Sequence, residues 1–257
     1  MVLAALAALG LLAGCGDDDD DDAAAGDPVT VTGVGHDDVA SAIAEYVGLI
    51  GGSDNGGEPG ARDTGYRTIT WDALPDELAA PNLYVSDFFN APEAPRARGA
   101  VITTDGDGLM VSADDDNPSG TPSRFGNLNP TYADVFTPFS EARLFSPVGS
   151  NVADLEFFVP GTDEPAGVRG FGAVYLDVDT DHTAFEYFDV DGRSLGTYGA
   201  PVADGDVSFL GLLFEEPVIH RVRITYGTVE LGPADAGDDD VAVMDDFVYS
   251  EPQPLAG

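Results

Sequence analysis

The chain has 257 residues and is strongly acidic, with 47 Asp and Glu residues against 10 Lys and Arg residues and a formal net charge of -37. Nucleic acids and anionic membrane surfaces attract clustered Lys and Arg, so this balance excludes nucleic acid as a partner and argues against anionic lipid headgroups. The chain has a single Cys. It therefore forms no internal disulfide, and stability has to come from a packed core, with bound metal as a second source.

The first segment of the chain is apolar and ends at that Cys. Residues 2–14 are apolar or Gly, a run too short for a membrane-spanning helix of about 20 residues but typical of an export signal. The sequence LAGC at residues 12–15 resembles a bacterial lipobox, which implies cleavage before Cys15 and a lipid on its sulfur. We predict a lipoprotein signal peptide over residues 1–14, with an ordinary secretory signal as the alternative.

The predicted lipid at Cys15 makes the membrane a partner and places the protein in the bacterial cell envelope, exposed to the periplasm or at the cell surface. Residues 15–36 include six consecutive Asp and contain almost nothing that a core would bury. Like charges in series repel one another and keep a chain extended. We predict an acidic, disordered tether over residues 15–36.

A helical pattern follows the tether. Val39, Ile43, Val47 and Ile50 recur at helical spacing, with Asp before them and two Gly after them. We predict one short N-terminal amphipathic helix and a Gly-rich linker over residues 37–65. Most apolar stripes of this kind face a core, so we expect the helix to dock on the following domain rather than on a partner.

From residue 66 onward the pattern changes to short strands separated by turns. Alternating or apolar runs such as YRTITW, DLEFFV, FGAVYLDV and VIHRVRITY are separated by turns rich in Gly, Pro, Asp and Asn. Regular short strands without helical periods between them predict an all-β, antiparallel β-sandwich. We divide this part into an N-terminal β region over 66–150, packed on or part of the sandwich, a jelly roll over 151–252, and a tail over 253–257.

The stretches GFGAVYLDVD, FEYFDVDGRSLG, VSFLGLLF, VIHRVRITYG and VAVMDDFVYSEP resemble the jelly-roll domains of secreted bacterial proteins that often carry a PEP-CTERM sorting tail. The resemblance covers about residues 151–252. It implies a galactose-binding-like or carbohydrate-binding-module-like sandwich of uncharacterised function. No activity follows from it.

The sequence carries no catalytic signature. It has no Gly-x-Ser-x-Gly elbow, no phosphate-binding loop and no zinc-type cluster, and His36, His182 and His220 are far apart in the chain. With 47 acidic residues, a pair of carboxylates is weak evidence for glycoside hydrolysis. We predict that the protein is not an enzyme.

Two groups of Asp residues predict a structural calcium site. In VAVMDDFVY both faces of the strand are apolar, so at least one of Asp245 and Asp246 should point inward and need a partner. Calcium would satisfy it with oxygen ligands, and Asp177, Asp179 and Asp181 could contribute more of them. The alternative is that Asp246 accepts backbone hydrogen bonds or lies at an exposed bulge.

The residues predicted to bind a ligand are Trp71, Asn82, Asn127 and Asn129, which combine an aromatic platform with amides in loops. Tyr84, Phe88 and Phe89 are further aromatics for a sugar-stacking face, although aromatics at strand spacing usually belong to a core.

These features predict a non-catalytic β-sandwich module, anchored at the cell envelope, for neutral glycans or another neutral or cationic surface partner. The first alternative is a structural or adhesive envelope protein without a small ligand. A glycan-active enzyme is the weaker alternative.

Overall fold

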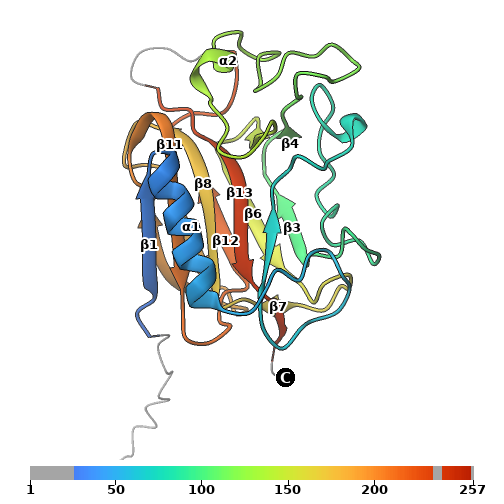
Figure 1. Ribbon diagram of the computed structural model, residues 1–257, viewed down its shortest axis with the longest axis vertical. Coiled ribbons are helices and arrows are strands. Elements are labelled where there is room, and N and C mark those ends of the chain that lie inside the picture. Colours follow the sequence, from blue (N-terminus) through green and yellow to red (C-terminus); the bar gives the residue numbers. More distant parts are fainter. Residues whose placement is uncertain (1–25, 234–238, 256–257) are drawn as a thin grey trace, which may run out of the picture.

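The computed structural model describes residues 26–233 and 239–255, which form two antiparallel β-sheets packed face to face (Figure 1). This confirms the predicted all-β sandwich. Within the described residues the larger sheet has strand order β1-β11-β8-β13-β5-β4, with β2 also paired to β13. Its strands are β1 (Val29–Val34), β2 (Tyr66–Ile69), β4 (Gly108–Val111), β5 (Phe145–Val148), β8 (Gly170–Val178), β11 (Ala203–Leu213) and β13 (Val243–Ser250).

The smaller sheet has strand order β10-β9-β12-β6-β3. Its strands are β3 (Ala100–Thr103), β6 (Val152–Phe157), β9 (Ala184–Phe188), β10 (Ser194–Gly199) and β12 (Arg221–Thr225). In β12, Val222 and Ile224 are buried between the sheets, while Arg223 lies on the outer face. The alternation of apolar and polar residues in this strand therefore matches one buried and one outer face.

The central strand β8 is covered on both faces, which explains why its sequence is apolar almost throughout. Phe171 and Tyr175 pack into the core between the sheets, and Val174 packs on the other face of the strand. Opposite it in β11, Gly211 pairs with Gly172, and a side chain at Gly211 would meet the rings of Phe209 and Tyr46. These glycines let a helix approach the sheet closely.

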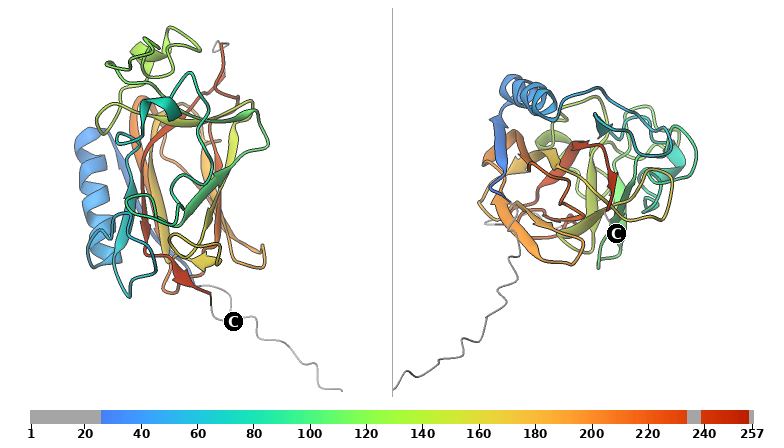
Figure 2. Two further views of the ribbon diagram at one scale, coloured as in Figure 1. Left: turned by 90° about the vertical axis from the view of Figure 1, so that its right-hand side faces the viewer. Right: turned by 90° about the horizontal axis from the view of Figure 1, so that it is seen from below.

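That helix is α1 (His36–Ile50), which covers the outer face of the larger sheet (Figure 2). It confirms the predicted amphipathic helix and its docking on the domain. The most buried positions are Val39, Ala42, Tyr46 and Ile50, whereas Ile43 and Val47 are only partly buried. Tyr46 is completely buried because its hydroxyl donates to the carbonyl oxygen of Leu212 at 2.7 Å.

The predicted tether extends too far along the chain. Residues 29–34 form β1, which pairs with β11 in register from Val29 opposite Leu213 to Val34 opposite Ser208. The sequence VTVTGV alternates as a strand does, but the acidic residues before it suggested a disordered segment. The part of the tether before residue 26 lies outside the described residues.

The predicted boundary at residue 150 is not a structural boundary. β3 pairs with β6, and β5 pairs with β13, so residues 66–150 are part of the sandwich. The predicted tail also contains structure, because β14 (Gln253–Pro254) pairs with β7 (Ala166–Gly167). Two short helices, η1 (Asp76–Leu78) and α2 (Tyr132–Val135), lie in the connections of this region.

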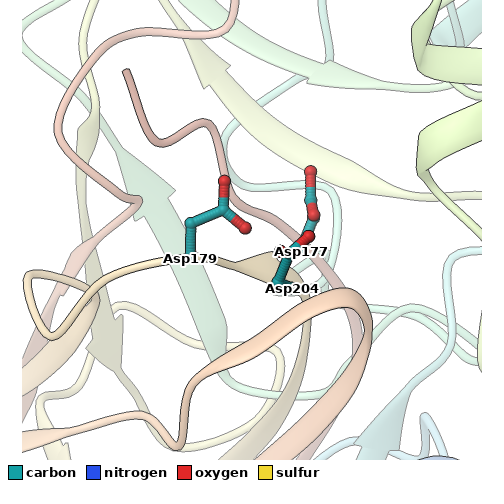
Figure 3. A group of neighbouring side chains, drawn as sticks. All are labelled: Asp177, Asp179 and Asp204. Carbon is teal, nitrogen blue, oxygen red and sulfur yellow. The ribbon is translucent and has the colours of Figure 1, made fainter. Parts of the chain in front are cut away.

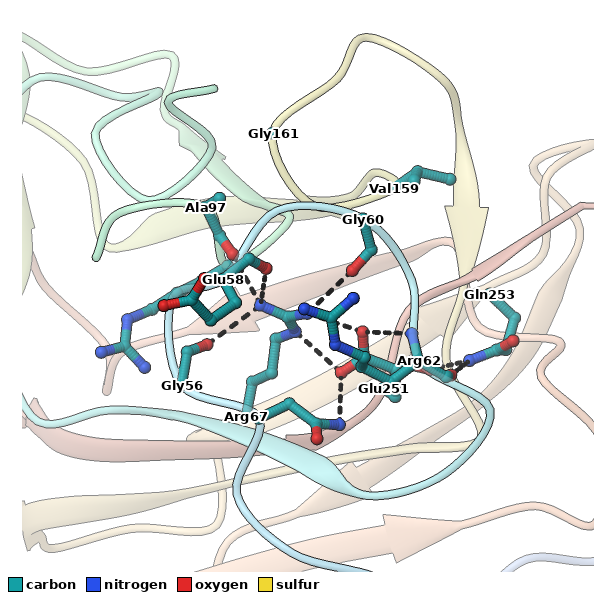
Figure 4. Close-up of polar contacts among 12 residues, drawn as sticks. Gly56, Glu58, Gly60, Arg62, Arg67, Ala97, Val159, Gly161, Glu251 and Gln253 are labelled. Atoms are coloured by element: carbon teal, nitrogen blue, oxygen red, sulfur yellow. Dashed lines mark hydrogen bonds and ion pairs between the residues drawn. The ribbon is translucent and has the colours of Figure 1, made fainter. Parts of the chain in front are cut away.

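A buried ion pair joins β2 to Glu251, the residue that follows β13 (Figure 4). Arg67 on β2 donates from Nε and Nη2 to both carboxylate oxygens of Glu251, at 2.8 and 2.7 Å. Its remaining hydrogen bonds go to the carbonyl oxygens of Gly56, Glu58, Gly60 and Ala97. Residues 51–65 therefore wrap around a guanidinium group and are not a free linker.

Candidate functional site

Three carboxyl groups meet at one serine hydroxyl near the end of the β2–β13 pair that lies opposite Glu251. The Oγ of Ser140 is 2.9 Å from Asp245, 2.8 Å from Asp246 and 3.3 Å from Asp72. Asp245 is fully buried, which confirms that at least one acid of this strand points inward. A hydroxyl has one proton to donate, so Ser140 cannot satisfy all three groups at once.

The backbone of the segment around Ser140 satisfies the rest of this cluster. Asp245 accepts hydrogen bonds from the amides of Phe139 and Ser140, at 2.8 and 3.1 Å. Asp72 accepts from the amides of Ala142 and Arg143, at 2.9 and 3.1 Å. Neutral donors thus hold these carboxyl groups, and no ion pair joins Asp72, Asp245 or Asp246 to a cation in the described residues.

Asp245 is buried and Asp246 is partly buried, and neither pairs with a cation in the described residues, which changes their protonation. Burial raises the pKa of Asp245 well above its ordinary value, and the charge of Asp246 raises it further. Burial also raises the pKa of Asp246, although hydrogen bonds from Ser140 and Asp245 oppose this. The charge of one group raises the pKa of the other, so the two carboxyl groups titrate as an interacting pair.

A second group of carboxylates lies at the end of β8 (Figure 3). Asp177, Asp179 and Asp204 each offer an oxygen atom, and these atoms lie within 4.8 Å of one another. Asp177 also accepts a hydrogen bond from the amide of Gly205 at 2.8 Å, which ties β8 to the start of β11. This spacing fits a divalent cation that binds oxygen ligands at about 2.3–2.6 Å.

The structure divides the predicted calcium ligands between these two places. Asp177 and Asp179 lie together as predicted, and Asp204 joins them in place of Asp181, whose side chain is almost fully exposed beside His182. Asp245 and Asp246 lie instead at Ser140. In the Ser140 cluster, a protein hydroxyl occupies the point at which the carboxyl groups converge.

The largest cleft described lies between the segment that precedes β3 and the loop that follows β6. Its volume is about 600 Å³, which is within the range of small-molecule sites. Asn90 fixes the two walls, because its Nδ2 donates to the carbonyl oxygen of Thr162 and its Oδ1 accepts from the amide of Gly161. The lining residues are Leu78, Val85, Asp87, Phe88, Asn90, Ala91, Pro92, Arg96, Gly161, Thr162 and Asp163.

Phe88 is the aromatic residue of this cleft. Its ring is half-buried, packs edge-on against Phe89 at 5.0 Å and lies 5.2 Å below the guanidinium group of Arg96. Asp87 and Asp163 are exposed carboxylates in the same lining. One ring with carboxylate acceptors in the same lining provides apolar contact for a sugar and hydrogen bonds for its hydroxyl groups.

The four predicted ligand residues are not brought together. Trp71 is a core residue, 1% exposed, and stacks on Phe145 with 4.3 Å between ring centroids. It has a positive φ of 67°, and its indole nitrogen donates to the carbonyl oxygen of Asp245. Trp71 is therefore not the exposed aromatic platform that we predicted. The backbone turns directly after β2, which the local sequence does not indicate.

The predicted asparagines lie in different surroundings. Asn82 lines a depression of about 270 Å³ with Asn117 and Asp76, outside the Phe88 cleft. Asn129 is buried and accepts from the amide and hydroxyl groups of Thr131, which is a turn-capping role. Asn127 has a buried Oδ1 with no hydrogen-bond partner in the described residues. Neither Asn127 nor Asn129 lines the depression that contains Asn82, so the three amides do not line it together.

Sequence reasoning missed Asp72, Ser140 and Asp204. Asp72 could have been noticed, because it follows a strand directly and precedes a turn. Asp204 and Ser140 carry no local signal, since they reach the other acids only through strand pairing distant in the sequence. Cys15, the predicted lipid attachment site, lies outside the described residues.

No helix in residues 26–233 and 239–255 has both the length and the apolar character needed to cross a bilayer. Neither a scan against protein-family models nor a search of curated proteins gives a match for the chain. The functional argument therefore depends on the geometry of the chain itself.

Proposed function

We propose that this chain is a non-catalytic binding module of the bacterial cell envelope, anchored by a lipid on Cys15, and that it binds a neutral glycan in the Phe88 cleft. The observation that carries the proposal is the cleft itself. It combines ligand-sized volume, a half-buried aromatic ring and two exposed carboxylates within walls that Asn90 holds together.

The distribution of perturbed carboxyl groups supports a binding role over catalysis. A general acid for glycoside hydrolysis needs a raised pKa beside the scissile bond. Burial raises the pKa of Asp245 and of Asp246, and neither residue lines the cleft. A structural or adhesive role is the alternative, in which the cleft has no ligand.

Calcium is proposed as a structural ion, with Asp177, Asp179 and Asp204 as its protein ligands. The convergence of their oxygen atoms supports this assignment. Bound there, calcium would hold the end of β8 against the start of β11 and offset the repulsion among three carboxylates. Asp181, Asp245 and Asp246 are not part of this proposed set.

The glycan proposal is tested by screening the purified full chain on a glycan array and measuring the affinity of any hit. Replacing Phe88 with Ala should weaken binding about tenfold, or about 1.4 kcal/mol. Val190→Ala is the matched control, because Val190 is 51% exposed and does not line the cleft. Equal affinities for the two variants would contradict the assignment of the site.

Two further outcomes would favour the alternatives. If no glycan or envelope extract binds, the structural role remains. If the purified chain hydrolyses a polysaccharide and Asp163→Asn abolishes turnover, the protein is an enzyme. The anchor has a separate test, in which cells that express Cys15→Ser are fractionated. A variant that stays processed and membrane-bound like the parent would contradict the lipid attachment at Cys15.

A further inference from the structure

A smaller pocket adjoins the glycan cleft and shares Phe88 and Arg96 with it. Its volume is about 130 Å³, equivalent to about four water molecules. This is enough for one small ring or a short branched chain, whereas the cleft has room for a sugar. The lining residues are Ile69, Thr70, Trp71, Ala73, Leu74, Phe88, Phe89, Pro95, Arg96 and Arg98.

Aromatic and aliphatic side chains form most of the wall of this small pocket. Trp71 packs edge-on against Phe89 with 5.7 Å between ring centroids, and Phe89 packs edge-on against Phe88. Trp71 and Phe89 are buried, so the half-buried ring of Phe88 is the aromatic surface of this group that a guest can contact. A flat apolar group therefore fits the wall better than a hydrated polar one does.

Two guanidinium groups provide the charge of the small pocket. Arg98 lies 5.8 Å from the centre of the Phe89 ring and donates from Nη1 to the carbonyl oxygen of Thr68 at 2.6 Å. Its Nε is buried and has no hydrogen-bond partner in the described residues. Arg96 pairs with Glu93, which is an exposed contact of small energetic value.

The charge of Arg98 is not balanced by the described protein. Arg67 and Arg143 are buried and contact carboxylates directly. Arg98 is half-buried, yet no carboxylate in residues 26–233 and 239–255 pairs with it, and none lines the small pocket. A partly desolvated guanidinium group without a counter-charge is unfavourable, and its planar donors match a carboxylate.

The net charge of the chain does not oppose an anion at this position. Exposed charges are largely screened beyond about 8 Å at physiological ionic strength, so local groups dominate. Glu93 pairs with Arg96, and Asp87 lines the larger cleft rather than the small pocket. Inside the small pocket, both ionisable groups are cations.

We propose that the small pocket binds a carboxylate attached to a flat apolar ring, with the ring against Phe88 and the carboxylate at Arg98. This goes beyond the proposed glycan site, because a neutral sugar in the cleft requires no anion-binding group. It also identifies a ligand class that the net charge of the sequence argued against.

The chain contains a built-in reporter for this pocket. Trp71 is its only tryptophan and lines the pocket, so its fluorescence responds to a guest there. The purified full chain is titrated with benzoate and, in parallel, with benzamide, which has nearly the same shape without the charge. We expect a saturable change with benzoate and at least about tenfold weaker binding of benzamide. Equal affinities, or no saturable change with either compound, would overturn the proposal.

Variants of Arg98 then test whether its charge binds the carboxylate of benzoate. Arg98→Gln should weaken benzoate binding about tenfold and bring it close to that of benzamide, whereas Arg98→Lys should keep part of the preference. Arg223→Gln is the matched control, since Arg223 is an exposed arginine on the outer face of the smaller sheet. Unchanged benzoate affinity in a folded Arg98→Gln protein would overturn the proposal.

The experiment still decides between the outcomes if the Arg98→Gln variant does not fold or if the glycan proposal is wrong. If Arg98→Gln fails to fold, the comparison of benzoate with benzamide on the unaltered chain still decides the question. The inference also fails separately from the proposed function. Benzoate binding without any glycan hit would leave the small pocket standing and remove the glycan site, and the opposite result would do the reverse.

Discussion

The paired strands β2 and β13 have buried carboxyl groups near both ends, and the two ends accommodate them differently. At one end, Glu251 receives two hydrogen bonds from the guanidinium group of Arg67. At the other end, Asp245, Asp246 and Asp72 converge on the hydroxyl group of Ser140. The first arrangement balances charge, and the second supplies only neutral donors.

Because of this difference, we expect one end of the strand pair to be rigid and the other to respond to solution conditions. A buried ion pair whose hydrogen bonds are all satisfied resists change, and removal of one partner leaves a buried charge. Carboxyl groups held by neutral donors respond instead to protons and cations. We therefore expect the Arg67 end to control stability and the Ser140 end to control its dependence on pH.

The largest effect is expected from Arg67→Met. This change leaves Glu251 buried without a counter-charge and four carbonyl oxygens without their donor. The free energy of unfolding should fall by about 3–5 kcal/mol, measured by urea denaturation. Arg223→Met is the matched control, for which at most about 1 kcal/mol is expected.

A second variant sharpens this prediction. Adding Glu251→Gln to Arg67→Met removes the buried charge, so the double variant should be more stable than the single variant. If Arg67→Met lowers the free energy of unfolding no more than Arg223→Met does, the Arg67–Glu251 pair does not control stability. The two ends of β13 would then not differ in the way expected.

Calcium should have the next largest effect. An ion that binds only the folded chain stabilises it by about 2.7 kcal/mol at a hundred times its dissociation constant. We expect calorimetry to show a higher melting temperature in excess calcium than in chelator, and Asp204→Asn to abolish the difference. Asp246→Asn should leave it intact. If only Asp246→Asn abolishes the difference, calcium binds at Ser140 and displaces its hydroxyl.

The pH dependence of the Ser140 end is the third prediction. The folded-state pKa of Asp246 is raised, so its favourable contribution is present below the ordinary value of 3.8 and is lost as pH rises through the raised pKa. At neutral pH, each unit by which folding raises this pKa lowers the free energy of unfolding by about 1.4 kcal/mol. Asp246→Asn should therefore gain stability relative to the parent as pH rises from acid to neutral.

Urea denaturation of the parent and Asp246→Asn across this pH range measures the gain. Asp163→Asn is the control, because Asp163 is exposed and its removal should leave the pH dependence nearly unchanged. A stability difference between parent and Asp246→Asn that does not vary with pH would show that the pair is not protonated as the geometry implies.

Sequence patterns predicted the parts of this molecule that depend on local periodicity. The sandwich and the inward position of at least one acid in β13 follow from the pattern of apolar residues in the strands, and the helix at residues 36–50 follows from apolar residues at helical spacing. β1 was missed because its alternating sequence follows a run of acids and its partner, β11, lies far along the chain.

The candidate sites were less predictable because their members come together only through the fold. Ser140 lies 105 residues before Asp245, and Asp204 reaches Asp177 through the pairing of β8 with β11. Trp71 was expected in a ligand site, but a positive φ directs its ring into the core. Composition gave no indication that Arg98 lacks a carboxylate partner among so many acids.

The smallest effect is expected at a third kind of carboxylate, the partly exposed Asp154 on the outer face of the smaller sheet. It accepts from Arg221 at 2.7 Å and from Arg223 at 3.0 and 3.1 Å. Partial burial alone would raise the pKa of Asp154, but hydrogen bonds from Arg223 and Arg221 outweigh it and lower the pKa. Its stabilising contribution is therefore present above the ordinary value of 3.8 and is lost as pH falls through the lowered pKa.

Asp154→Asn should cost at most about 1 kcal/mol at neutral pH, because solvent screens this pair, and the cost should shrink in acid and in high salt. Urea denaturation at two pH values and two salt concentrations measures both trends. The sign of this pH dependence is opposite to that of Asp246, since guanidinium groups stabilise one carboxylate and burial without a cation destabilises the other. A cost comparable with that of Arg67→Met would mean that exposure does not set the strength of these pairs, and the contrast between the two ends of β13 would then need another cause.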